Sequence, residues 1–183
     1  MKEFFVEKAS KVKKAAKMIE NKVKIRISVV KNKVVLRGNE LNEFIVGEII
    51  HAIDFGFDAE DALLLANENF VLEFINIKEH TRRRNLEEVR SRVIGTGGRA
   101  KRTIEELTGG VMVINENSVG LIVHSEHLES AVQGIILLIQ GAKHGNVFSY
   151  IEKQNRALRM IDEEDLGLKN EGDLDLLDDE EID

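Results

Sequence analysis

The chain of 183 residues is 43% hydrophobic and 32% charged and contains no cysteine, which allows one large or two small domains and excludes disulfides, thiolate metal sites and thiol nucleophiles. Its apolar runs, such as Ile135 to Ile139, are far shorter than the roughly 20 residues that span a bilayer, and Glu3 and Glu7 exclude a secretory signal, so we expect a cytoplasmic protein. The net charge of −7 is uneven, because residues 162–183 carry −11 and the rest of the chain carries +4.

The first predicted unit covers residues 1–57. Alternating apolar residues predict strands at 3–6, 23–29 and 33–36, and a helix is expected at 10–21. A longer helix follows its predicted N-cap, Asn39. The apolar face expected for that helix is made of Leu41, Phe44, Ile45 and Ile49. A connecting helix over 58–66, capped by Asp58, leads out of this unit.

The second unit repeats this order with an offset of 87 residues, which places Leu41 over Leu128 and Gly47 over Gly134. Strands are predicted at 70–77, 111–114 and 119–123, with helices at 86–94 and 98–107. A further helix begins at the N-cap Ser125, and its apolar face is made of Leu128, Val132, Ile135, Ile136 and Ile139. The first unit has only about eight residues before its first helix, so we expect it to be a truncated copy.

A helix over 146–160 is predicted to follow the second unit, packing Val147, Phe148, Ile151 and Leu158. The acidic segment after it has too little apolar surface for its charge, and we expect it to be disordered. The predicted fold class is therefore α+β, with two small antiparallel sheets that each pack helices on one face. The expected divisions of the chain are the first unit at 1–57, a connecting helix at 58–69, the second unit at 70–145, a C-terminal helix at 146–161 and the acidic tail at 162–183.

The segment that carries chemistry is the glycine-rich turn Gly95-Thr96-Gly97-Gly98, between two short predicted helices. Main-chain amides at the positive end of the second helix favour a phosphate, and glycines permit close approach of a sugar-phosphate backbone. Residues 82–102 carry a charge of +6, the local footprint of a polyanion site. The basic residues of this stretch are Arg82, Arg83, Arg84, Arg90, Arg92, Arg99, Lys101 and Arg102.

This turn, with Ile94 before it and Ile104 and the Thr108-Gly109 stop after it, resembles the GXXG loop of a type I KH domain. The duplication and the segment Gly141-Ala-Lys-His144-Gly145-Asn-Val147-Phe148 make residues 2–160 similar to archaeal tandem-KH ribosome-biogenesis proteins, related to the eukaryotic partner-of-NOB family. In those proteins a diverged KH unit without GXXG comes first, and here Ala9 to Val12 contains no glycine. The chain departs from the family pattern at Thr96 and Gly97, which supply no basic side chain, and at Phe148, which replaces a tyrosine.

The resemblance implies an RNA-binding protein that is not an enzyme and uses no cofactor or metal. Its implied ligand is single-stranded small-subunit ribosomal RNA near the 3′ end, bound as a ribosome-assembly or rRNA-processing factor. Implied protein partners are a NOB-type endonuclease and the alpha subunit of translation initiation factor 2. A four-nucleotide strand would lie beside the loop on a floor of Ile94, Ile104 and Val113. The residues expected to flank or contact that strand are Arg92, Arg99, Lys101, Arg102 and His144.

Other interpretations of the same residues stay open. Gly95-x-Gly97-x-x-Ala100, followed by Glu116, fits a loose dinucleotide fingerprint and would make the chain a cofactor-binding enzyme. The short helix and the hairpin after it favour a polyanion instead. The glycines also fit a plain structural corner between two helices. The chain as a whole also fits a scaffold that binds only proteins. The cluster His124, Glu126 and His127 contains metal-binding residue types but offers no obvious third ligand, so it is interpreted as a solvated helix start rather than a metal site. Glu105 with Glu106 is interpreted as an exposed helix face.

Overall fold

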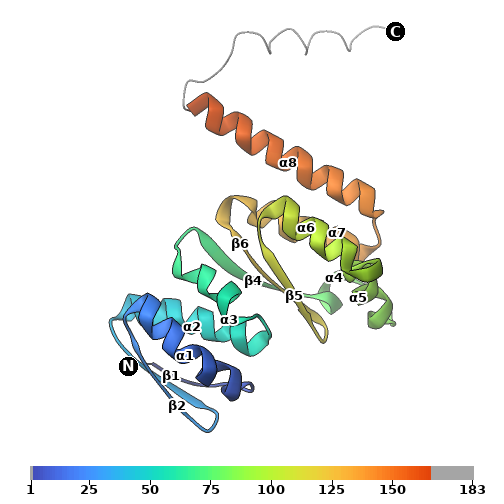
Figure 1. The fold of residues 1–183 in the computed structure, drawn as a ribbon. Coiled ribbons are helices and arrows are strands. Elements are labelled where there is room, and N and C mark those ends of the chain that lie inside the picture. Colours follow the sequence, from blue (N-terminus) through green and yellow to red (C-terminus); the bar gives the residue numbers. More distant parts are fainter. Residues whose placement is uncertain (1, 166–183) are drawn as a thin grey trace, which may run out of the picture.

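The computed structural model describes residues 2–165, with side chains as far as residue 160. Two α+β units follow one another along the chain (Figure 1). The first contains β1 (Lys2–Phe5), α1 (Ala9–Val23), β2 (Arg26–Val30), β3 (Lys33–Arg37) and α2 (Glu40–Phe55). A short linking segment, α3 (Ala59–Ala62) and the 3-10 helix η1 (Leu63–Ala66), leads to the second unit.

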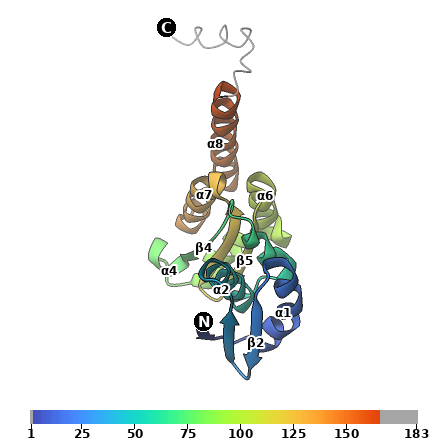
Figure 2. The ribbon, with the colours of Figure 1, turned by 90° about the vertical axis from the view of Figure 1, so that its left-hand side faces the viewer.

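The second unit contains the larger set of elements. They are β4 (Phe70–Asn76), α4 (Ile77–His80), α5 (Leu86–Ile94), η2 (Thr96–Gly98), α6 (Arg99–Thr108), β5 (Val111–Asn115), β6 (Ser118–His124), η3 (Ser125–His127) and α7 (Leu128–Gln140). The final helix, α8 (His144–Asp165), packs on α6 and α7 and then extends beyond them, on the side away from the first unit (Figure 2).

The two sheets have the same topology, which confirms the predicted duplication. Their strand orders are β1-β3-β2 and β4-β6-β5, and every pair in them is antiparallel. The first unit is truncated as expected, because only residues 6–8 separate β1 from α1. In the second unit, α4, α5 and the glycine-rich turn fill the corresponding place between β4 and α6.

The second sheet is covered on both faces, which the sequence did not predict. Its helix-side residues, such as Met112 and Leu121, belong to the core of the second unit. On the opposite face Ile122 is buried in the core of the first unit. Gly120 is the close-contact point between the units, since a Cβ atom there would lie 2.7 Å from the Phe55 ring and 2.8 Å from the Phe57 ring.

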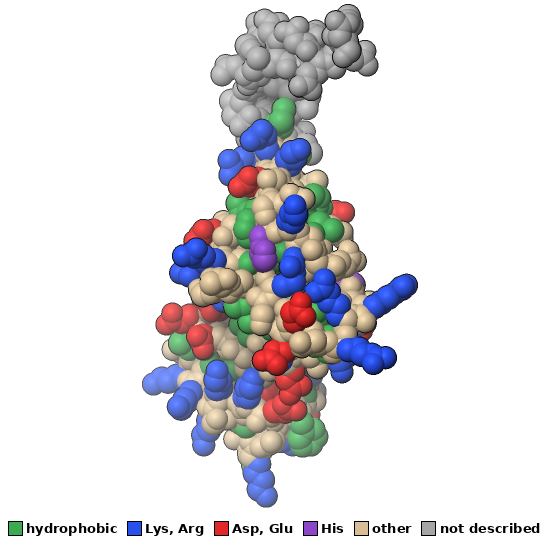
Figure 3. Space-filling view, turned by 90° about the vertical axis from the view of Figure 1, so that its right-hand side faces the viewer, with side chains coloured by type: hydrophobic (Ala, Val, Ile, Leu, Met, Phe, Trp, Pro, Cys, Tyr) green, Lys and Arg blue, Asp and Glu red, His purple; other side chains and the backbone are tan. Residues whose placement is uncertain are grey.

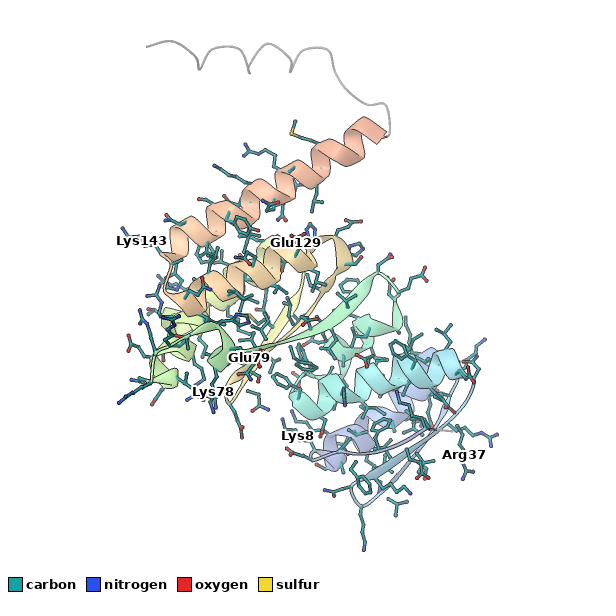
Figure 4. All side chains as sticks on the ribbon, turned by 180° about the vertical axis from the view of Figure 1, so that it is seen from behind. Lys8, Arg37, Lys78, Glu79, Glu129 and Lys143 are labelled. Atoms are coloured by element: carbon teal, nitrogen blue, oxygen red, sulfur yellow. The ribbon has the colours of Figure 1, made fainter. Side chains whose placement is uncertain are left out.

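A shared acceptor also joins the two units. The Phe55 carbonyl accepts a hydrogen bond from Lys8 Nζ at 2.7 Å and another from Asn115 Nδ2 at 2.8 Å. Lys8, labelled in Figure 4, comes from the first unit and Asn115 from β5 of the second. The packing and these hydrogen bonds make the junction between the units a buried, specific contact.

The predicted N-cap of α2 is confirmed, but only part of the predicted apolar face points to the core. Asn39 Oδ1 accepts from the Asn42 amide at 2.7 Å. Leu41 and Phe44 are 66% and 60% exposed, whereas Ile49 is fully buried and Ile45 partly buried. The helix has apolar residues on two sides, and the core takes the side of Val46, Ile49, Ile50 and Ile53.

Several predicted element ends were also wrong. The first helix continues to Val23 and ends where Lys24 takes a left-handed φ of 52°, so the strand after it starts only at Arg26. Ser125 begins the 3-10 turn η3 instead of capping α7, whose N-cap is His127. The last helix begins at His144 and ends at Asp165, so it includes the first residues of the predicted tail. The rest of that tail, residues 166–183, lies outside the described residues.

Candidate nucleic-acid interface

The glycine-rich turn, residues 95–98, connects the C-terminus of α5 to the N-terminus of α6 and depends on left-handed backbone. Gly95, Gly97 and Gly98 have φ values of 74°, 60° and 76°, which side chains disfavour. A Cβ atom at Gly95 would lie 2.7 Å from the backbone nitrogen and the Cβ of Ala100. At Gly97 and Gly98 it would meet nothing within 4 Å. Gly95 therefore makes the corner possible, while the other two glycines keep its outer surface bare.

Two main-chain amides of this turn point to no acceptor. The Gly95 amide donates to the Ser91 carbonyl at 2.8 Å, and the Gly98 amide donates to the Gly95 carbonyl at 3.1 Å. Within the described chain the amides of Thr96 and Gly97 have no such acceptor, and both residues are exposed. Amides left open beside a helix N-terminus are suited to bind an anion.

The three basic side chains near the turn have different surroundings. Arg102 donates from Nη2 to the Gly97 carbonyl at 2.8 Å and so holds the turn from outside. The Arg99 side chain is exposed and makes no hydrogen bond or ion pair with any described residue. Lys101 pairs with Glu105, with 3.1 Å between Nζ and the carboxylate. Figure 3, which faces the side where α5 and α6 lie in Figure 1, shows Lys and Arg side chains standing out from this surface.

Arg92 and His144 bind main-chain carbonyls rather than facing an open groove. Arg92 donates from Nη2 to the Ala142 carbonyl at 2.6 Å, and its buried Nε has no partner in the described chain. His144 Nε2 donates to the Arg92 carbonyl at 2.9 Å. The two side chains therefore fasten the end of α5 to the turn between α7 and α8.

The predicted apolar floor is only partly assembled. Ile94 is 36% exposed beside the turn, whereas Ile104 is completely buried in the second core. Val113 was placed on the wrong face, because it packs against the first unit. Its neighbours Met112 and Ile114 face the helices of the second unit instead. Alternation cannot distinguish these faces when both are covered by protein.

Glu105 is a site residue that the sequence did not reveal. It was expected on an exposed helix face, yet its carboxylate accepts from the Met112 amide at 2.8 Å and its side chain is 19% exposed. Met112 lies on β5, which pairs only with β6 among the described strands, so Glu105 occupies the strand edge beside α6. No spacing or composition signal in the sequence marks the contact between Glu105 and the Met112 amide.

The Glu105 carboxylate also affects the titration of Asp61. Burial raises the pKa of Asp61, and the charges of Asp58 and Glu105 raise it further.

The remaining basic residues of the 82–102 stretch also have local roles. Arg90 donates from Nη1 to the Glu116 carbonyl at 2.9 Å. Arg83 pairs with Glu88 at 3.2 Å, while Arg82 and Arg84 are exposed. Arg83 and Arg90 thus have partners outside the glycine-rich turn, and only Arg82 and Arg84 of this group are exposed with no hydrogen bond or ion pair among the described residues.

Two alternative sites lose their structural basis. The dinucleotide fingerprint requires a parallel strand-helix-strand unit, whereas every strand pair of the described chain is antiparallel. His124 Nδ1 lies 3.6 Å from Glu126, but residues 2–160 contain no group of three or more His, Asp or Glu side chains arranged to hold a metal ion. In the same part of the chain, no helix combines the length and the apolar character that a membrane span needs.

Comparisons with known proteins agree with this geometry. Residues 71–156 match the Eukaryotic type KH-domain (KH-domain type I) family, in the form of the second such domain of PNO1. A KH domain-containing protein of Methanocaldococcus jannaschii is 31% identical over 113 residues, which are 61% of this chain and 50% of that protein. The chain therefore spans about half the length of this curated relative.

Solved structures with the same fold include three from archaea. A protein of unknown function from Aeropyrum pernix is 26% identical with a TM-score of 0.82, over 92% of this chain and 98% of that one. Dim2p from Pyrococcus horikoshii is 28% identical with a TM-score of 0.73, over 84% and 99%. A chain from the a/eIF2alpha-aDim2p-rRNA complex of the same organism is 26% identical with a TM-score of 0.75, over 85% and 94%.

Proposed function

Because the chain is a PNO1-like KH protein of the archaeal type, we propose that it binds single-stranded RNA and serves in ribosome biogenesis by binding rather than by catalysis. The observation that carries this proposal is the bare glycine-rich turn, whose Thr96 and Gly97 amides have no acceptor among the described residues. An RNA phosphate supplies the acceptor that these amides lack.

The proposed ligand is small-subunit ribosomal RNA near its 3′ end. The support is the likeness to a chain of a complex that contains rRNA and a/eIF2alpha, together with the family resemblance of the glycine-rich turn. The same likeness supports the alpha subunit of translation initiation factor 2 as a protein partner. A NOB-type endonuclease is proposed on the resemblance alone.

The mechanism assigns different tasks to the basic residues. Thr96 and Gly97 amides hold a phosphate, and Arg99 adds an unpaired charge at the start of α6. Arg102 fixes the Gly97 carbonyl so that the turn keeps its shape before RNA arrives. Arg92 and His144 act through the backbone they hold, so they position the turn rather than contact the strand. Ile94 offers apolar surface to a base beside the turn.

The first unit has a different task in this proposal. Its residues Ala9 to Val12 belong to the first turn of α1, and no glycine corner exists there. It therefore lacks the side-chain-free corner that lets a sugar-phosphate backbone approach main-chain amides closely. We assign it to packing and to contacts with proteins.

The proposal is tested by titrating the full chain against a fluorescent RNA that carries the small-subunit 3′ end. An unrelated RNA of equal length, NAD and ATP are titrated in parallel. We expect the ribosomal RNA to bind best and its affinity to fall with added salt, because phosphate contacts release counterions. Binding of NAD or ATP without RNA binding would overturn the proposal in favour of a cofactor-binding enzyme. Absence of any salt-dependent RNA affinity would overturn it in favour of a protein scaffold.

A further inference from the structure

Helix α2 carries an apolar stripe that the protein core uses only in part, since Ile45 packs against the core while Leu41 and Phe44 do not. Leu41, Phe44 and Ile45 lie three and four residues apart, as neighbours on one side of a helix. Leu41 and Phe44 are 66% and 60% exposed, although the Lys2 ammonium lies 5.8 Å from the Phe44 ring centroid. Large apolar side chains gathered on an open surface are typical of an interaction site. We call these three residues the outer stripe.

The outer stripe forms one wall of a hollow between the two units. The opposite wall comes from Leu65 and Ala66 of η1 and from the first residues of β4, Phe70 to Leu72. The space between these walls is about 640 Å³, which is large enough for several side chains. We call it the α2–β4 hollow.

The strand beside the hollow has an unpaired edge. In the described sheet β4 pairs only with β6. The Asn69 carbonyl accepts from Ser125 and the Ile77 amide donates to Asn117, both at 2.8 Å. Hydrogen bonding alternates along an antiparallel strand, so the amides and carbonyls of Leu72 and Phe74 point away from β6. Such an edge is a template for one more strand.

The charge at the hollow defines what fits it. The charged residues that line it are Glu48 and Glu68, and Glu73 is exposed farther along β4. No lysine or arginine is among the lining residues. This surface repels a polyanion such as RNA and attracts a cationic segment.

We propose that the α2–β4 hollow is a docking site for an extended segment of a partner protein, in which apolar and basic side chains alternate. The segment adds a strand to the edge of β4 through Leu72 and Phe74. Its apolar side chains enter the hollow against the outer stripe, and its basic side chains point to the opposite face of the sheet, where Glu73 lies. Glu48 and Glu68 attract the segment from the lining of the hollow. This site does not depend on RNA binding at the glycine-rich turn.

The test uses the full chain and a fluorescent nine-residue peptide of alternating lysine and valine, measured by fluorescence anisotropy. A peptide of the same composition, with lysines and valines in separate blocks, controls for simple charge attraction. A third peptide, N-methylated at alternate residues on one edge, cannot complete the strand pairing. We expect the alternating peptide to bind at least tenfold more tightly than either control. Equal binding of the alternating and blocked peptides would overturn the proposal.

Two protein variants locate the site. Phe44→Ser removes the large exposed ring of the outer stripe, which is not part of the core, and we expect at least a tenfold loss of peptide affinity. Val30→Ser is the matched control, since Val30 is 64% exposed in the same unit but does not line the hollow. Unchanged binding by a folded Phe44→Ser variant would overturn the proposal.

Hydrogen exchange and sedimentation distinguish the remaining occupants. The peptide should slow exchange of the Leu72 and Phe74 amides, whereas loss of affinity without such protection would contradict strand addition. In sedimentation velocity of the protein alone, we expect no self-association that depends on Phe44. If the protein does self-associate and Phe44→Ser abolishes the association, the occupant of the hollow is a second copy of this chain. If unlabelled RNA displaces the peptide from wild-type protein and equally from a variant with Thr96→Asp and Gly97→Asp in the glycine-rich turn, the hollow is an RNA site. Either result would overturn a protein segment as the occupant.

Discussion

Arg102 donates from its guanidinium to the Gly97 carbonyl at 2.8 Å, and this contact sets the shape of the turn that we propose as the phosphate site. The pair lies five residues apart, so the first turn of α6 braces the loop that precedes it. A basic residue that the sequence places beside RNA thus has a structural task before any RNA is bound. The other basic residues of this surface also divide into those that hold the main chain and those that are free to contact RNA.

Arg99 and Arg92 should respond differently to replacement by alanine. Arg99→Ala is expected to weaken RNA binding several-fold and to lower the salt slope by about one, with unchanged stability. Arg92→Ala removes the hydrogen bond to Ala142 and should lower the free energy of unfolding by about 1–3 kcal/mol. Salt-dependent RNA titration and urea unfolding of both variants check this. If Arg92→Ala is as stable as wild type but binds RNA as weakly as Arg99→Ala does, the roles of the two arginines were assigned wrongly.

The glycines of the turn should differ in their tolerance of a methyl group. Gly95→Ala forces a Cβ atom to 2.7 Å from the Ala100 backbone nitrogen, and we expect a loss of more than ~2 kcal/mol of unfolding free energy. Gly97→Ala meets open space and should cost about 1–2 kcal/mol for its left-handed backbone alone. Denaturant unfolding of the two single variants measures the difference, and equal losses would contradict it.

The junction between the units should be sensitive at Gly120. Gly120→Ala brings a Cβ atom to 2.7 Å from the Phe55 ring, and overpacking of this kind costs about 1–3 kcal/mol. Gly145→Ala is the matched control, because nothing lies within 4 Å of its Cβ position. Thermal unfolding should show a lower Tm for the first variant only. An unchanged Tm for Gly120→Ala would mean that the units do not pack as described.

Glu43 should make stability depend on pH below neutrality. A hydrogen bond from the Gly38 amide holds the pKa of this carboxyl below its ordinary value of 4.5. A lowered pKa in the folded state stabilises the protein above the ordinary pKa, and this contribution disappears as pH falls through the folded value. Glu43→Gln should therefore be less stable than wild type at pH 7, with a difference that shrinks below pH ~4.5. A difference that grows toward acid pH would refute the assignment.

The order of elements was predictable from sequence because each local signal agreed with its neighbours. The bounds of α5, Leu86–Ile94, agree with prediction, and the structure adds a cap at Asn85 that the sequence analysis did not use. The Asn85 side chain accepts from the Glu88 amide. The truncation of the first unit was predictable from the small number of residues that precede its first helix.

The faces of the elements were less predictable than their order. Helix α2 has apolar residues on two sides, and only the packed structure shows that Leu41 and Phe44 point outward. Val113 was assigned to the wrong face because the first unit covers the back of β5. Glu105 reaches the Met112 amide across a tertiary contact, which no periodicity encodes. Each of these errors concerns what a side chain meets in space.

The central claim is that bare amides at Thr96 and Gly97 hold an RNA phosphate, and paired substitutions test it most directly. The variant Thr96→Asp with Gly97→Asp places two negative charges at the amides. The variant Thr96→Asn with Gly97→Asn has similar shape and backbone preference without charge. For folded proteins titrated with the small-subunit 3′ RNA at fixed salt, we predict at least tenfold weaker binding by the aspartate variant than by the asparagine variant. Equal affinities of the two variants would contradict the claim.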